Sequence, residues 1–395
     1  MERADQASGR KKILRNAAIG ASATALLIPV ASEIRVRRAA RALSDRWRHV
    51  PVEPRGPALL GISFRPLQAE ALGLDPYATL LTLLEHPFQL IRLGAYWNRM
   101  EPAPGTFDHD ELDSLVGAAE RAGKQIIMSV GPVKNFGYPE FFVPAHHLGE
   151  PLREGALVEP ADHGALLRAA TQFAARVVRR YRDRQSIIAW QVEHEAVDPL
   201  GVEHSWRLSA AFVRAEVEAV RAADPTRPVM MNGFLPTSAP VRLQQWWRTR
   251  DQGDSLSVAR DLADIVGIDF YPRHALLAAG GRTVYLDGSR SPWQQARRRR
   301  LFEWAAASGR RLMISEGQAE PWEAVTTPPS PGGQGMFSCL PEHVIENYSQ
   351  CMSWQREAPC GAWAYLFWGA EYWVLRQKQG DPRYLEAFAR VLHDS

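Results

Sequence analysis

Several signals that would assign this chain to a common protein class are missing from its sequence. Only three of its 395 residues are cysteines, Cys339, Cys351 and Cys360, and their spacing fits neither a zinc site nor a CxxC redox motif. Two of them could form a disulfide and leave one free, or all three could be ordinary buried residues. The histidines form no HxH or HExxH pattern, and no GxGxxG or phosphate-loop motif is present. We therefore expect no metal and no cofactor.

The chain also lacks a strong charge imbalance and a long apolar segment. Its net charge is +3, and much of the basic excess lies in the first 50 residues, so we do not expect a nucleic-acid partner. The apolar run 17–31 follows a basic stretch and has the length of a signal-peptide core, which is short for a spanning helix. We interpret residues 1–55 as a signal peptide or membrane-anchor leader with a basic linker, so we expect the protein to be secreted or anchored to a membrane. The alternative is an amphipathic N-terminal helix on a cytoplasmic protein. We also expect the protein to be a monomer.

Beyond this leader, short apolar runs alternate with amphipathic helical patterns. Strands are expected at 59–63, 89–94, 125–130, 187–192, 228–232, 264–269, 311–315 and 361–367. Helices are expected near 75–86, 109–123, 162–184, 203–223, 256–263, 292–308, 341–357 and 382–393. Regular strand–helix alternation predicts parallel strands, and eight such units close a barrel. We therefore predict a single α/β domain over residues 56–395, a (β/α)8 TIM barrel.

Two of the expected strands deliver a glutamate at their C-terminal end. Glu195 ends the segment that starts at Ile187, and Glu316 ends the segment that starts at Arg311. A buried carboxylate is costly without a partner, so each could simply form a salt bridge at the rim of the fold. In a barrel, however, both lie on the active-site face. Two facing carboxylates are what cleavage of a glycosidic bond requires.

The motifs that carry these glutamates resemble those of clan A glycoside hydrolases, which are retaining (β/α)8 enzymes that include families 5 and 42. The phrase Trp190-Gln-Val-Glu-His-Glu195 is similar to the clan's strand-four motif, and Ile314-Ser-Glu-Gly317 is similar to its strand-seven motif. The loop Trp97-Asn-Arg-Met-Glu-Pro-Ala-Pro-Gly-Thr-Phe-Asp108 is similar to the clan's loop after strand two. The resemblance spans roughly residues 57–393. It implies that Glu195 is the acid/base and Glu316 the nucleophile.

The resemblance also implies roles for residues at three other strand ends. Arg92 matches an arginine near the nucleophile, and Tyr271 matches a tyrosine that forms a hydrogen bond with the nucleophile. Trp368 matches the tryptophan that forms the floor of the sugar-binding site. His194 stands where the clan has an asparagine that donates to the sugar 2-hydroxyl. A histidine can also donate from a ring nitrogen, but it titrates, so we expect an altered substrate or pH preference, or impaired activity.

Aromatic side chains supply surfaces on which sugar rings stack. Besides Trp368, we expect Trp97, Tyr138 and Trp322 to bind substrate because each follows a strand end. For Trp206, Trp246 and Trp304, on predicted helices, we expect packing against the barrel instead.

Glu193 is a second candidate for the acid, because residues two apart on an extended strand, such as Glu193 and Glu195, point to the same face.

The two glutamates and the family resemblance together predict a retaining glycoside hydrolase of β-linked glycans or oligosaccharides. A catalytically impaired carbohydrate-binding barrel is the alternative. A metal-dependent barrel hydrolase is a third candidate, which the absence of HxH at the end of strand one disfavours.

Overall fold

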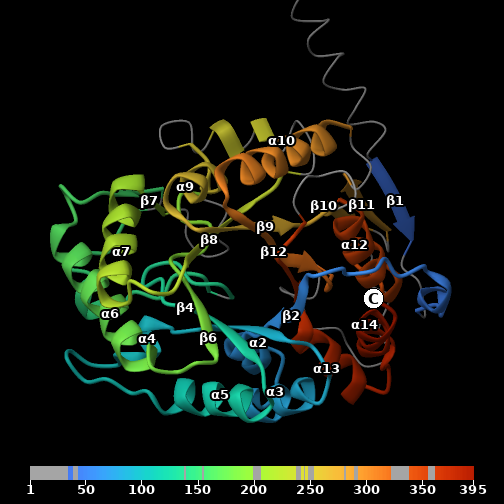
Figure 1. The fold of residues 1–395 in the computed structure, drawn as a ribbon, viewed down its shortest axis with the longest axis horizontal. Helices are drawn as coiled ribbons and strands as arrows, with labels where there is room; N and C mark the ends of the chain where they lie inside the picture. Colours follow the sequence, from blue (N-terminus) through green and yellow to red (C-terminus); the bar gives the residue numbers. More distant parts are fainter. Residues whose placement is uncertain are drawn as a thin grey trace, which may run out of the picture.

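A computed structural model of the chain describes residues 34–38, 43–137, 139–153, 155–198, 206–236, 242–243, 245–247, 253–279, 282–288, 292–321, 338–354 and 361–395. Eight parallel strands close into a barrel with the order β12-β13-β2-β3-β4-β6-β8-β9, and helices surround it (Figure 1). The strands are β2 (Leu59–Ser63), β3 (Leu90–Gly94), β4 (Gln125–Ser129), β6 (Ile187–Gln191), β8 (Val229–Phe234), β9 (Ile265–Phe270), β12 (Arg311–Gln318) and β13 (Ala364–Trp368). The predicted (β/α)8 barrel is therefore confirmed.

The outer helices follow the strands in the expected order. They are α3 (Pro76–Leu84), α5 (Asp110–Arg121), α6 (Gly164–Tyr181), α7 (Ala210–Ala223), α9 (Ser255–Leu262), α10 (Pro292–Ser308), α12 (Pro341–Ser353) and α14 (Arg383–Asp394). Three short helices were not predicted, namely α2 (Pro66–Ala71), α4 (Trp97–Met100) and α13 (Ala370–Lys378). Several helix starts are fixed by side-chain caps. For example, Asp75 accepts from the backbone of Ala78 before α3, and Ser209 accepts from Phe212 before α7.

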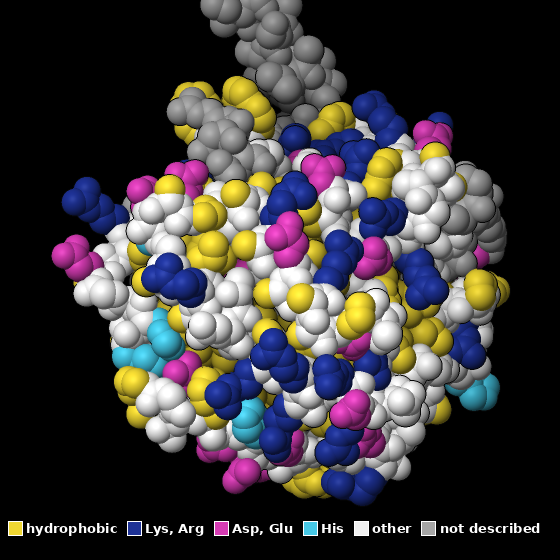
Figure 2. All heavy atoms as spheres, turned by 60° about the vertical axis from the view of Figure 1, so that its left-hand side comes forward, with side chains coloured by type: hydrophobic (Ala, Val, Ile, Leu, Met, Phe, Trp, Pro, Cys, Tyr) yellow, Lys and Arg dark blue, Asp and Glu magenta, His cyan; other side chains and the backbone are white. Residues whose placement is uncertain are grey.

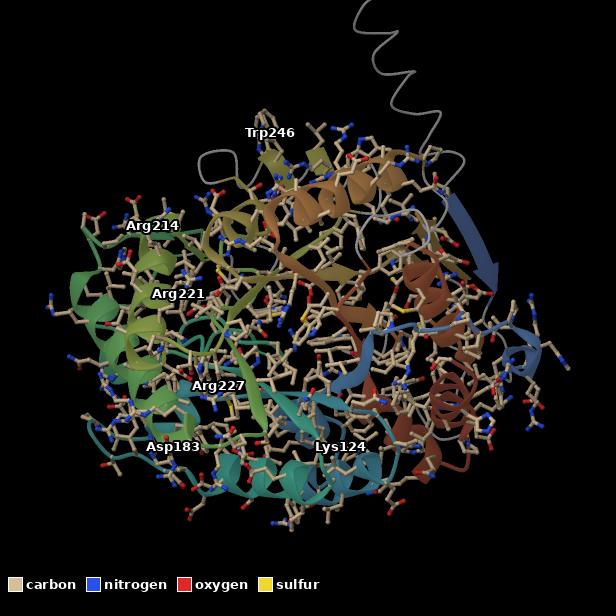
Figure 3. The ribbon with its side chains drawn as sticks, in the orientation of Figure 1. Lys124, Asp183, Arg214, Arg221, Arg227 and Trp246 are labelled. Carbon is tan, nitrogen blue, oxygen red and sulfur yellow. The ribbon has the colours of Figure 1, made fainter. Side chains whose placement is uncertain are left out.

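Two hydrophobic layers hold the barrel together. One lies inside it and contains a residue of almost every strand, namely Leu90, Ile127, Ala189, Met230, Ile265, Met313, Ala364 and Leu366. The other lies between the strands and the helices and includes alternate residues such as Ile91, Ile126 and Trp190. Figure 3 shows side chains filling the space that the strands enclose. Because side chains alternate along a strand, the inward residues beyond the apolar layer are the ones that reach the C-terminal mouth.

A small antiparallel sheet of order β1-β11-β10 is added to the barrel after the sixth barrel strand. It consists of β1 (Ile34–Arg38), β10 (Arg273–Ala279) and β11 (Arg282–Asp287). The strand β1 pairs with β11 from Ile34 opposite Leu286 to Arg38 opposite Arg282. Trp47, in a 3-10 helix at Arg46–His49, is buried in the core. Described parts of the predicted leader therefore pair with and pack against the rest of the domain, whereas the apolar run 17–31 lies outside the described residues.

The described part of the chain contains no helix that is both long and apolar enough to span a membrane. Cys339 and Cys351 are free and buried, and Cys360 lies outside the described residues. On the face over α6 and α7, basic side chains are interspersed with acidic ones (Figure 2).

The tryptophans expected on helices differ in their environments. Trp206 is buried, and Trp304 is half-buried and packs against the core. Trp246 is 47% exposed and lies at the periphery of the molecule (Figure 3), so it does not pack against the barrel as expected. The predicted helix 203–223 begins only at Ala210, since Ser209 caps its first turn.

Candidate active site

The Glu316 carboxylate lies at the centre of a buried polar cluster at the mouth of the barrel. Arg92 Nη2 donates to Glu316 Oε1 over 2.6 Å, and the Tyr271 hydroxyl donates to Oε2 over 2.5 Å. His194 Nε2 lies 2.9 Å from Oε1. The structure thus brings together the residues that the sequence predicted at the ends of strands two, four, six and seven.

A local irregularity in β12 turns Glu316 into the barrel. Strict alternation would place Met313 and Ser315 inside and Glu316 outside. The register between β12 and β9 shifts between Ile314 and Glu316, which is a β-bulge. Both Ser315 and Glu316 therefore reach inward, since Ser315 Oγ donates to Asp269 Oδ1 over 2.7 Å. Bulges beside active sites re-aim side chains in this way.

The surroundings of Glu316 favour its charged form. Burial raises the pKa of Glu316, but His194 and Arg92, with the hydrogen bonds from His194 and Tyr271, outweigh burial and lower the pKa to about 2. Burial lowers the pKa of His194, whereas the charge of Glu316 and the hydrogen bond to it raise that pKa. Arg92 supplies the permanent positive charge. Its guanidinium is itself held by Ser63 Oγ at 2.9 Å and Gln191 Oε1 at 3.3 Å.

Glu195 lies in the opposite electrostatic environment. Burial raises its pKa well above the ordinary value, and the neighbouring charges of Asp269, Asp198 and Glu316 raise it further. Glu195 forms a side-chain hydrogen bond with Asp269, which is fully buried. Asp269 also accepts from Asn232 Nδ2 over 2.6 Å. Burial and the charge of Glu316 also raise the pKa of Asp269 well above its ordinary value, whereas the hydrogen bond from Glu195 lowers it, so Glu195 is the donor of this carboxyl pair.

The backbone after β6 is unusual, and it separates Glu193 from Glu195. Both have positive φ, +55° and +44°, which costs about 1–2 kcal/mol for a residue other than glycine. The segment is thus a turn and not an extended strand, so the prediction that both side chains share one face is wrong. The Glu193 carboxylate instead accepts from the backbone of Val133 at 3.1 Å and of Lys134 at 2.5 Å.

Lys134 holds this turn in place. Its buried ammonium donates to the carbonyl oxygens of Glu195 and Asp198, each over 2.8 Å. The loop that carries Lys134 approaches so closely that a Cβ on Gly131 would lie 2.3 Å from the backbone nitrogen of Glu193. This structural role was not predicted, although Lys134 follows closely on an expected strand end.

Trp368, at the end of β13, forms one wall of the site. Its ring is half-buried and lies parallel to the His194 ring, with 6.4 Å between centroids and 3° between planes. The Arg65 guanidinium lies 4.3 Å from the Trp368 centroid. Arg65 is itself fixed by buried ion pairs with Glu320 at 2.7 Å and Glu371 at 2.6 Å. Sequence reasoning missed this support, although Arg65 follows the first strand.

Trp97 is not part of this cluster. Trp97 has no exposed surface, packs on Phe173 with 5.4 Å between centroids, and donates from Nε1 to Glu101 over 2.7 Å. A ring buried in this way cannot stack on a sugar, so the structure corrects the prediction for Trp97. Tyr138 and Trp322 lie outside the described residues.

Within the part of the chain that the structure describes, two groups of side chains have the chemistry to hold a cation. In the first, one ligand atom each of His194, Asp269 and Glu316 lies within 4.8 Å of the others. The Arg92 guanidinium already binds Glu316 there, and its charge would repel a metal ion. The second group is Glu101, His146 and His147, which lies outside the cluster around Glu316.

The comparisons with known proteins agree with this architecture. A family model described as beta-galactosidase, that of glycoside hydrolase family 42, matches residues 80–212. No curated protein matches the chain. Among solved structures, GH5_18 from Streptomyces cattleya in complex with GlcNAc is 13% identical, with a TM-score of 0.54 over 87% of this chain and 80% of that one.

Two beta-galactosidase structures give a similar result. The enzyme from Bacillus circulans sp. alkalophilus is 11% identical, with a TM-score of 0.50, and the match covers 87% of this chain and 56% of that one. The enzyme from Rahnella sp. R3 is 11% identical, with a TM-score of 0.51, and 87% and 57% are covered. The chain therefore spans little more than half the length of these beta-galactosidases. The structural matches show the (β/α)8 fold, and the family match over residues 80–212 agrees with the predicted resemblance to clan A glycoside hydrolases.

Proposed function

We propose that this chain is a retaining glycoside hydrolase that cleaves β-linked glycans or oligosaccharides, with Glu195 as acid/base and Glu316 as nucleophile. The observation that carries the proposal is that two carboxyl groups of one cluster lie in opposite electrostatic environments. Glu316 receives hydrogen bonds from three side chains, one of them a guanidinium, whereas Glu195 is surrounded by negative charge. Environments that push two carboxyl pKa values apart are how acid and nucleophile are assigned in such sites.

The proposed reaction proceeds by double displacement. A carboxylate oxygen of Glu316 attacks the anomeric carbon while the Glu195 carboxyl gives its proton to the leaving oxygen, so the glycosidic bond breaks and a glycosyl ester forms. Glu195, now a carboxylate, takes a proton from a water molecule as that water attacks the same carbon. The ester bond to Glu316 breaks in the same step. Both groups are thereby restored, and the sugar is released with its configuration retained.

Asp269 would keep the Glu195 carboxyl group protonated and in position for the first step. Its carboxylate accepts from Asn232 and Ser315 and also bonds Glu195. A negative neighbour disfavours loss of the Glu195 proton, and the hydrogen bond holds the carboxyl group at the mouth of the barrel. Asp269 is thus a positioning residue for the acid.

The sugar bound at Glu316 would lie against Trp368. Its indole is half-buried in the cluster, and Arg65 and the parallel His194 ring limit its movement. Polar groups such as His194 and Gln191 lie near the nucleophile, where hydroxyl groups of the sugar would be recognised.

A panel of chromogenic β-glycosides, beginning with β-galactosides and β-mannosides, tests the proposal. We expect turnover of at least one substrate by the wild-type protein and at least a thousandfold loss in Glu316→Ala. Glu386→Gln is a suitable control, because it alters a 43% exposed carboxylate on α14. Sugar binding without turnover would support the impaired carbohydrate-binding barrel instead.

We also propose that the N-terminal segment directs export or anchors the chain to a membrane. The support is the basic stretch before the apolar run 17–31. Fractionation of cells that express the full chain and a chain starting at residue 34 would test this. Equal amounts of both in the cytoplasmic fraction would contradict it.

A further inference from the structure

A carboxylate and two histidines converge between two loops of the barrel mouth. Glu101 follows α4 in the loop after β3, and His146 and His147 lie in a 3-10 helix, η2 (Ala145–His147), in the loop after β4. His147 Nε2 is 2.9 Å from Glu101 Oε2, and His146 Nε2 is 3.6 Å from Glu101 Oε1. Both histidines thus point their outer ring nitrogens at one carboxylate.

The 2.9 Å separation is that of a hydrogen bond, and both separations also fit ligands around a single metal ion that the Glu101 carboxylate binds. Two atoms that are each 2.0–2.1 Å from a common ion lie about 2.9 Å apart at a right angle and about 3.6 Å apart at 120°. One ligand atom from each of the three residues lies within 4.8 Å of the others. The two imidazole centroids are 4.4 Å apart, with 50° between the ring planes.

Neighbouring groups fix the carboxylate in the way that outer partners of metal ligands do. The Trp97 indole donates to Glu101 Oε2 over 2.7 Å, and the Gly105 backbone donates to Oε1 over 3.0 Å. The His147 ring packs against the Trp97 ring with 4.7 Å between centroids. Hydrogen bonds of this kind orient metal ligands and commonly raise affinity 10–100-fold.

The cluster is accessible on one side. The side chains of His146 and His147 are 22% and 24% exposed, whereas that of Glu101 is 6% exposed. An ion could therefore enter from solvent and keep a water molecule in its remaining positions. Imidazole and carboxylate together suit zinc and similar divalent transition ions, whereas calcium and magnesium prefer oxygen ligands alone.

We propose that Glu101, His146 and His147 bind one zinc-type divalent cation, which ties the loop after β3 to the loop after β4. The two loops already touch, since the Asn98 backbone donates to the Phe142 carbonyl over 2.8 Å. A bound ion would add a crosslink on the same face of the barrel as Glu316. The proposal does not depend on the proposed hydrolase activity.

Cobalt titration of chelator-treated full-length protein tests the site directly, because Co²⁺ in a nitrogen and oxygen site absorbs in the visible range. We expect one equivalent to bind, with at least a hundredfold weaker binding in His146→Ala and His147→Ala. Trp97→Phe should weaken binding 10–100-fold, because it removes the indole donor. His393→Ala, which changes an 89% exposed histidine near the C-terminus, is the matched control and should bind as the wild type does.

Glu316→Gln separates this site from the catalytic carboxylates. Binding that persists in Glu316→Gln and is lost in the folded His147→Ala variant, with folding checked by circular dichroism, supports the proposal. Binding that is lost in Glu316→Gln and kept in His147→Ala would place the ion on His194, Asp269 and Glu316 and overturn it. We expect a dissociation constant on the order of micromolar. If the wild type binds neither Co²⁺ nor Zn²⁺ at about 100 µM, the proposal is also overturned.

Discussion

Replacing Arg92 by methionine removes the permanent charge that faces Glu316, and the structure sets the size of the effect. Arg92 Nη2 and Glu316 Oε1 are 2.6 Å apart, and both side chains are buried. Opposite charges with centres about 4 Å apart interact by about 4 kcal/mol at an effective dielectric constant of 20. This energy equals about 3 pKa units. The pKa of Glu316, about 2 in the native protein, should therefore rise toward about 5 in Arg92→Met.

The same shift predicts how stability depends on pH. A carboxyl group whose folded pKa is about 2 and whose ordinary value is 4.5 stabilises the fold above pH 4.5, by about 3 kcal/mol. This contribution is lost as the pH falls through 2. In Arg92→Met the depressed pKa is gone, so the variant should be about 3–5 kcal/mol less stable at pH 7. Its deficit should shrink below pH 5, where Glu316 takes up a proton in the variant alone.

Urea unfolding between pH 4 and 7 measures this deficit, and kcat/KM over the same range measures the nucleophile. Arg92→Lys is the matched control, because it keeps the charge and loses the bonds from the guanidinium to Ser63 and Gln191. Its deficit should not vary with pH, and the acid limb of kcat/KM should move toward pH 5 only in Arg92→Met. A deficit in Arg92→Met that is independent of pH, with an unmoved acid limb, would refute the account of Glu316.

Further substitutions test the other members of the cluster. Asp269→Asn should lower the pKa of Glu195 and move the basic limb of kcat/KM to lower pH, since a negative neighbour is lost; an unmoved limb would show that Asp269 does not act on the acid. His194→Asn should keep turnover within about tenfold, because an amide can still donate to Glu316 and His194 Nδ1 is buried with no partner among the described residues; an inactive, folded variant would assign the histidine another role. Trp368→Ala should weaken sugar binding by roughly 1–3 kcal/mol with little loss of stability, and calorimetry showing unchanged affinity would make Trp368 a packing residue. Glu316→Ala should regain turnover of activated substrates with azide and give the inverted glycosyl azide, whereas rescue of Glu316→Ala with retention would exchange the roles of the two glutamates.

The sequence predicted the barrel because its strands and helices have clear periodicities. Seven of the eight expected strands start within one residue of the observed ones, and the polar residues at their ends share one mouth because parallel strands align. The expected strand at 361–367 began too early, since Ala364 is the first residue of β13. Arg92, Tyr271 and Glu316 lie in one cluster, as strand order and the family resemblance together predicted.

Features that depend on long-range contacts could not be predicted. The β12 bulge appears in the pairing with both neighbouring strands, between Ile314 and Glu316 against β9 and between Ile314 and Gly317 against β13, and no local pattern encodes it. The left-handed turn at Glu193 is stabilised by the loop after β4, whose backbone binds the Glu193 carboxylate. Glu193 therefore does not share a face with Glu195, as an extended strand would require. Trp97 follows a strand end as sugar-binding tryptophans do, but contacts with Phe173 and Glu101 bury it. The pairing of β1 with β11 joins residues about 250 positions apart.

Trapping with an activated 2-deoxy-2-fluoro β-glycoside tests the central claim most directly. The fluorine slows both steps and the good leaving group restores the first, so a retaining enzyme accumulates the covalent intermediate. The substrate would be chosen from the sugar that the glycoside panel identifies, and peptide mass spectrometry would locate the label. We predict one equivalent of sugar per chain, bound to Glu316 and absent from Glu316→Ala. Label on another residue, or steady turnover of the parent glycoside with no covalent label, would contradict the assignment of Glu316 as the nucleophile.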